Sequence, residues 1–145
     1  MATTTTETMG RTGSGFGPLQ IAITLLVAAT ALVHLFLGAN MAMALMSPPT
    51  QAAGMGGATM VAILAVLFLC NFGGYVVLNA ALYLPVLRRY QRVTRVPLIG
   101  YTALTFVAYF AIDQGQALNP IGLSDKAVEA ALIALLVIDG RRARA

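Results

Sequence analysis

Long apolar runs lie on both sides of a short arginine-rich segment, and this pattern constrains the fold more than any other feature. Residues 88–95 read RRYQRVTR, in a chain that is otherwise almost bare of charge. An arginine held in hydrocarbon costs about 2.5 to 3.5 kcal/mol on insertion scales, so we expect this segment to lie in water. Basic loops are retained on the cytoplasmic side of a membrane. The four arginines of the segment are Arg88, Arg89, Arg92 and Arg95.

The composition agrees with a chain that lies in a membrane. Of its 145 residues, 59% are hydrophobic and 10% are charged, whereas soluble domains carry about 25% charged residues. The apolar runs are continuous rather than alternating, which argues against a transmembrane β-barrel. The single cysteine, Cys70, excludes an intramolecular disulfide and any motif built from paired cysteines. We therefore predict an all-α integral membrane protein of the plasma or inner membrane.

The apolar runs predict four transmembrane helices that form one bundle over residues 18–142. The spans cover about residues 18–46, 58–87, 97–113 and 125–139, and a span needs about 20 residues. Prolines suit the first turns of the first and third spans, and Ser124 is a plausible N-cap for the fourth. The fourth apolar stretch is short, so a helix in the membrane interface is its alternative. Residues 1–17 are expected to form a disordered cytoplasmic tail, and residues 143–145 a basic C-terminal end.

The distribution of basic residues predicts how the chain is threaded. With four spans, eight arginines fall on one side of the membrane and Lys126 alone falls on the other. This asymmetry is the positive-inside pattern for a protein with cytoplasmic N and C termini. The arginines of residues 88–95 and of the C-terminal end are expected to contact anionic lipid headgroups. Nucleic acid is not expected as a partner, because only Tyr90 is interleaved with these arginines. Besides the four arginines of residues 88–95, the set comprises Arg11, Arg141, Arg142 and Arg144.

Ionisable residues inside the predicted spans are the candidates for function, because each is costly in a membrane and requires a partner. His34, Asp113 and Glu129 come from three different spans, and the threading puts all three in the outer half of the membrane. They could form a site for protons or a small ligand, in which a carboxylate orients the His34 ring. A histidine and two carboxylates could also bind a divalent metal. In the structural alternative, His34 bonds to a backbone carbonyl or an asparagine, and both carboxylates face the headgroups.

Other polar and small residues are expected to hold the helices together. Glycines permit close helix approach in membranes, and hydroxyl and amide groups form interhelical hydrogen bonds worth about 0.6 kcal/mol each. A pocket for quinone or lipid, lined by the tyrosines, is the alternative interpretation. The candidates for close contact are Gly38, Gly73 and Gly74, and the polar candidates are Asn71, Tyr75, Asn79, Tyr101, Thr105 and Tyr109.

The sequence contains no motif for a catalytic nucleophile, a phosphate-binding loop or a zinc protease, and it indicates no cofactor. We therefore expect a non-enzymatic multi-pass membrane protein that is an accessory or structural subunit of a membrane complex, or a homo-oligomer. Its partners would be other membrane subunits or copies of itself. The alternative is a small transporter, or a protein that binds quinone, lipid or another cofactor, with His34, Asp113 and Glu129 as its site.

Overall fold

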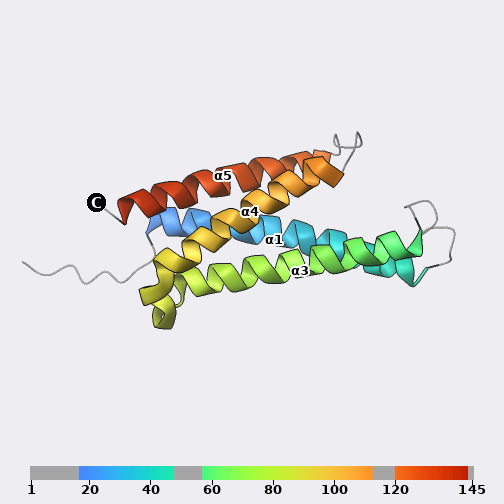
Figure 1. Ribbon diagram of the computed structural model, residues 1–145, viewed down its shortest axis with the longest axis horizontal. Coiled ribbons are helices and arrows are strands. Elements are labelled where there is room, and N and C mark those ends of the chain that lie inside the picture. Colours follow the sequence, from blue (N-terminus) through green and yellow to red (C-terminus); the bar gives the residue numbers. More distant parts are fainter. Residues whose placement is uncertain (1–16, 48–56, 113–119, 144–145) are drawn as a thin grey trace, which may run out of the picture.

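All the elements that the structure describes are helices (Figure 1). The computed structural model describes residues 17–47, 57–112 and 120–143. The elements, in chain order, are α1 (Pro18–Leu45), α3 (Ala58–Tyr83), the 3-10 helix η1 (Pro85–Tyr90), α4 (Gln91–Ile112) and α5 (Pro120–Arg142). The predicted all-helical class is confirmed for these residues.

Three of the four α-helices, α1, α3 and α4, are long and apolar enough to cross a membrane. α1 has 28 residues and α3 has 26, so at 1.5 Å per residue they measure about 42 and 39 Å. α5 is not among the three, and it carries Asp125, Lys126 and Glu129 in its first half. Length and apolar composition therefore indicate a membrane protein, and α5 is the helix that departs from the pattern.

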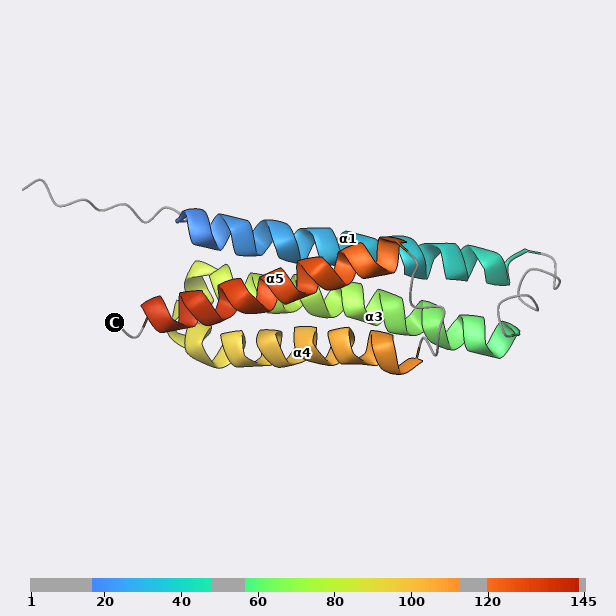
Figure 2. The same ribbon diagram turned by 90° about the horizontal axis from the view of Figure 1, so that it is seen from above.

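The four α-helices run lengthwise beside one another (Figure 2). η1, the first turn of α1 and the last turn of α5 lie at the same end of the bundle, on the left in both views. We call this end, which holds the described arginines, the arginine end. At the opposite end, α1 and α3 extend past α4 and α5. The hairpin of α1 and α3 is therefore the longest part of the bundle.

The bounds of α1 and α3 follow from local chemistry. Pro18 opens α1, where its missing N–H is not needed, and the Gly17 amide donates to Gln20 Oε1 at 3.1 Å. Gly57 precedes α3 with a φ of 93°, a backbone conformation that favours glycine. α3 ends at Tyr83, earlier than the predicted span, because Pro85 restricts the residue before it and the chain continues as η1.

α4 begins inside the arginine-rich segment, six residues before the predicted start at Pro97. Pro97 therefore lies within the helix, where its ring removes one backbone hydrogen bond. The expectation that the whole segment lies in water is wrong for Arg95, which is 9% exposed. Burial is possible because Arg95 Nη2 contacts Asp139 Oδ2 of α5 at 2.6 Å, which neutralises its charge.

α5 also begins earlier than predicted, at Pro120. Ser124 is therefore not the N-cap but lies in the first turns, where its hydroxyl donates to the Pro120 carbonyl. The helix continues past Asp139 and ends at Arg142. Arg141 and Arg142 in the last turn lie close to the negative end of the helix dipole, which favours cations there.

The hydrophobic core lies between the four helices, whereas their outer faces remain apolar. Leu25, Leu32 and Phe36 of α1 are 64%, 60% and 59% exposed, as expected of a surface in contact with lipid. The core itself is formed by Ile23, Val27, Ala31, Tyr75, Leu82, Leu98, Leu132 and Leu136.

Two of the three glycines predicted to lie at close helix contacts do so. A Cβ atom at Gly38 would lie 2.9 Å from Leu69 Cγ, and one at Gly74 would lie 2.5 Å from the Tyr101 hydroxyl. At Gly73, an added Cβ atom would meet no described atom of another helix within 4 Å, so the described structure brings no helix close there. Adjacent residues of a helix point in different directions, and the crossing uses only the face of Gly74.

Replacing Gly74 with leucine should lower the melting temperature of the protein in detergent, followed by circular dichroism. The larger side chain would collide with Tyr101 and push α3 away from α4, and such overpacking costs about 1 to 3 kcal/mol. Gly73→Leu is the matched control, because it adds the same side chain one residue away in open space. Equal losses in the two variants would contradict this assignment.

Candidate functional site

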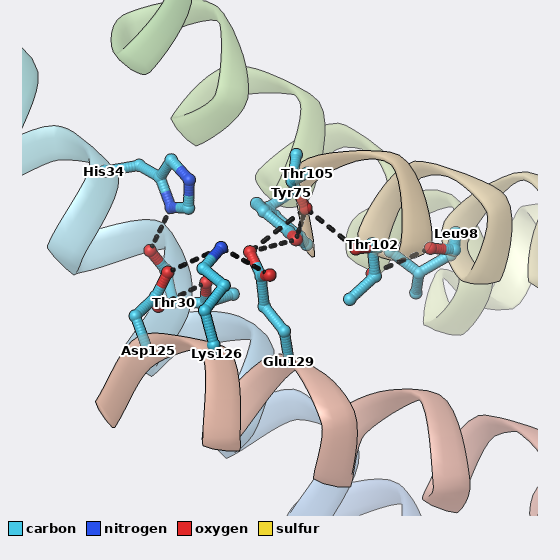
Figure 3. A network of polar contacts seen from close by, with 9 residues as sticks. All are labelled: Thr30, His34, Tyr75, Leu98, Thr102, Thr105, Asp125, Lys126 and Glu129. Atoms are coloured by element: carbon cyan, nitrogen blue, oxygen red, sulfur yellow. Dashed lines mark hydrogen bonds and ion pairs between the residues drawn. The ribbon is translucent and has the colours of Figure 1, made fainter. Parts of the chain in front are cut away.

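Polar side chains from all four α-helices meet in the interior of the bundle (Figure 3). Each of them is at most 9% exposed, and Glu129 and Tyr75 are fully buried. We call this group the central cluster. It consists of Thr30 and His34 from α1, Tyr75 from α3, Thr105 from α4, and Asp125, Lys126 and Glu129 from α5.

An ammonium group held between two carboxylates is the electrostatic centre of the cluster. Lys126 Nζ lies 2.5 Å from Glu129 Oε2 and 3.4 Å from Asp125 Oδ2. Residues three apart on a helix share a face, so the sequence of α5 itself brings Lys126 and Glu129 together. In a dry interior this pairing is needed, because an isolated buried charge is very costly.

α1 contributes two residues one helical turn apart. Thr30 Oγ1 donates to Asp125 Oδ1 at 2.7 Å, and His34 Nδ1 lies 2.8 Å from the Thr30 carbonyl oxygen. A carbonyl oxygen can only accept a hydrogen bond, so Nδ1 must carry the hydrogen. When the ring is neutral, Nε2 is then the nitrogen that can accept a proton.

The second oxygen of Glu129 faces α3 and α4. Tyr75 OH and Thr105 Oγ1 lie 3.2 and 3.0 Å from Glu129 Oε1, and they lie 2.9 Å from each other. Each hydroxyl has one hydrogen, so the two groups cannot make all these donations at once. The hydrogen bonds around Glu129 can therefore exchange without any movement of the helices.

A short series of hydroxyl groups leads from the cluster along α4 toward the arginine end. Thr105 Oγ1 also lies 2.9 Å from the Thr102 carbonyl, and Thr102 Oγ1 donates to the Leu98 carbonyl at 2.8 Å. Backbone carbonyls accept hydrogen bonds but cannot pass a proton on. These hydroxyl groups therefore stabilise the site and do not form a continuous proton wire.

The formal charges of the central cluster do not sum to zero. With ionised carboxylates, a protonated Lys126 and a neutral His34 ring, two negative charges face one positive charge, which leaves a net charge of −1. One further positive charge would make the cluster neutral. Because uncompensated charge is unfavourable in a buried site, the geometry favours binding of a proton or another small cation.

The cluster also contains a donor set that a metal could use. Ligand atoms of His34, Asp125 and Glu129 all lie within 4.8 Å of one another. The ammonium of Lys126, however, already contacts both carboxylates. A divalent ion would have to displace this group, so the arrangement fits a proton better than a resident metal.

The structure joins two of the three predicted site residues. His34 and Glu129 lie in the central cluster, whereas Asp113 lies outside the described residues. Asp125 supplies the second carboxylate. His34 bonds to a backbone carbonyl, as in the structural alternative, but Glu129 is fully buried and does not face the headgroups.

The polar residues that were predicted to pack between helices lie in different parts of the bundle. Tyr75 and Thr105 belong to the central cluster, and Lys126 Nζ lies 5.3 Å from the centre of the Tyr109 ring. Tyr101 donates to Asn71 Oδ1 at 2.7 Å, which is the expected interhelical bond between α3 and α4. Asn79 Oδ1 is buried and has no hydrogen-bond partner among the described residues.

Sequence reasoning missed Thr30, Asp125 and Lys126 as site residues. The predicted fourth span begins at about residue 125, which places Asp125 and Lys126 near the outer surface. The start of α5 at Pro120 brings both residues into the interior of the bundle. The spacing of Lys126 and Glu129 was the signal that could have revealed the ion pair.

The chain matches no protein-family model, no curated protein and no solved structure. The chemistry of the central cluster is therefore the basis on which a function can be assigned.

Replacing Lys126 with methionine should destabilise the protein by about 3 to 5 kcal/mol, because it leaves two carboxylates buried without a counter-charge. Lys126→Met combined with Glu129→Gln should cost much less than the sum of the single changes, since the double variant removes both members of the pair. Unfolding in denaturing detergent measures all four proteins of this cycle. Additive losses would show that the two residues do not interact.

Proposed function

We propose that the protein is a four-span integral membrane protein with cytoplasmic N and C termini that carries protons through the central cluster. The observation that carries this proposal is a buried polar cluster built by all four helices, whose charged members, Asp125, Lys126 and Glu129, all come from α5 and leave a formal net charge of −1. Ionisable residues in membrane spans typically mark ion pathways and proton relays. A small transporter that moves protons across the membrane is the function that fits this chemistry best.

The depth of the cluster supports a role in transport. Thr30 lies 12 residues after Pro18, and Glu129 lies 13 residues before Arg142, which correspond to about 18 and 20 Å along the helices. The hydrocarbon core of a bilayer is about 30 Å thick, so both distances end near its midplane. Transporter binding sites commonly lie at this depth, where access can alternate between the two sides.

The arrangement of hydroxyl groups favours a transporter over an open channel. The series from Glu129 through Thr105 and Thr102 ends on backbone carbonyls, so a proton needs another route toward the arginine end. The two alternative donors to Glu129, Tyr75 and Thr105, allow the local bonds to change when its charge changes. We therefore infer slow, gated movement of protons that depends on rearrangement of the cluster.

An accessory subunit or homo-oligomer is the second candidate, and one surface favours it. The outward face of α4 is apolar at helical spacing, with Gly100 in the middle and no described atom within 4 Å of a Cβ atom there. Small residues on such a face permit close approach of another membrane helix. The exposed side chains on this face are Val93, Val96, Leu104 and Val107.

The threading predicts opposite labelling of two exposed positions after Cys70 has been replaced by serine. Met46 and Val86 are 90% and 84% exposed, and they lie at opposite ends of the bundle. In intact cells, Met46→Cys should react with an impermeant maleimide, and Val86→Cys should react only after the cells are permeabilised. The reverse pattern would invert the proposed orientation.

Proteoliposomes loaded with a pH-sensitive dye test the proposed transport of protons. Under a potassium diffusion potential, the wild type should acidify the lumen, and both Glu129→Gln and His34→Gln should slow this at least about tenfold, as loss of an essential proton carrier does. Asn79→Leu is the control, because Asn79 is a polar residue of α3 outside the central cluster. Wild-type liposomes no more permeable than empty ones would refute the proposal and favour the accessory role.

A further inference from the structure

A second site for a charged ligand lies at the arginine end, between α4 and α5. A groove of about 230 Å³ is lined there by the three arginines Arg92, Arg95 and Arg141, together with Gly140. We propose that this groove binds a phosphate group, carried by an anionic membrane lipid. The proposal is independent of the proton-carrying role of the central cluster and requires only that the chain lies in a membrane.

The groove has the charge that a phosphate needs. Three guanidinium groups face one carboxylate, that of Asp139, which leaves a net charge of +2. The C-terminal end of α5 opposes an anion, but its dipole corresponds to only about half a negative charge. The arginines therefore dominate, and guanidinium groups match the oxygens of phosphate in geometry as well as in charge.

A residue that lines the groove, Arg95, carries a buried donor without a partner among the described residues. Arg95 is 9% exposed, and Nη2 binds Asp139, but its Nε is buried and has no hydrogen-bond partner among the described residues. A Cβ atom at Gly140 would lie 3.9 Å from this Nε, so the absence of a side chain at Gly140 leaves room beside the guanidinium. A buried unsatisfied donor costs free energy, and an anion bound here would satisfy it.

The other two arginines of the groove, Arg92 and Arg141, lie at its rim. Arg92 Nη2 donates to the Ala143 carbonyl at 3.3 Å, which holds its guanidinium beside the last turn of α5. Arg141 projects from that same turn. Arg92 and Arg141 are both exposed, so they can adapt to a ligand, whereas Arg95 is fixed by its ion pair.

The apolar walls of the groove favour a lipid over a free ion. Ile99 and Leu136 line it beyond the arginines, and Val96 and Val137 extend the apolar surface outward, with 68% and 37% of their surface exposed. A lipid would place its phosphate on the arginines and an acyl chain along these walls. Inorganic phosphate shares the first contact but cannot make the second.

Native mass spectrometry of the full-length protein with phosphatidylglycerol and phosphatidylcholine tests the proposal. The wild type should retain one phosphatidylglycerol in preference to phosphatidylcholine. The double variant Arg92→Gln/Arg141→Gln should bind it roughly 30-fold more weakly, as expected for the loss of two arginine contacts at a membrane surface. Arg95 is left unchanged because its ion pair supports the fold.

The matched control is Arg89→Gln/Arg142→Gln, which removes two charges from the same end but none from the groove. It should retain nearly all binding of phosphatidylglycerol. Equal losses in the two double variants, or equal binding of both lipids by the wild type, would overturn the proposal. Inorganic phosphate is the second arm: displacement of the lipid only at far higher concentration supports a lipid occupant, whereas phosphate that binds as tightly as the lipid overturns it.

Discussion

The ion pair between Lys126 and Glu129 is the interaction on which the rest of the structure depends. Burying these charges is favourable only when their remaining hydrogen-bonding capacity is met by neighbours. Tyr75 of α3 and Thr105 of α4 meet it for Glu129, and Thr30 of α1 binds Asp125. Each helix must therefore take a defined rotation and height relative to α5, which fixes the register of the whole bundle.

Two kinds of contact hold the helices together. α1 and α3 meet through apolar and small residues, as where Gly38 lies against Leu69. α5, the least apolar helix, is held by polar contacts at both the central cluster and the arginine end, where Asp139 binds Arg95. Between helices in hydrocarbon, the hydrophobic effect supplies no attraction. The polar contacts of α5 therefore stabilise its packing against the other helices.

The same contacts connect stability with the proposed function. The ammonium of Lys126 offsets the charge of one carboxylate, which permits burial of the cluster, whereas the charge of the second carboxylate has no counter-charge within the cluster. A fully neutral cluster would still hold the helices together, but it would have no net charge to attract an ion. The remaining charge is the feature that links the fold to the proposed movement of protons.

The sequence by itself determined the helical class, the apolar spans and the candidates His34 and Glu129, because hydrophobic run length and the cost of buried charge act locally. Tertiary structure decided which partners these residues have. Lys126 and Asp125 joined the site only because α5 begins at Pro120 and packs against α1 and α4. Arg95 became buried because Asp139, distant in the chain, neutralises it. Pairings across helices depend on their relative rotation and height, which no local pattern in the sequence specifies.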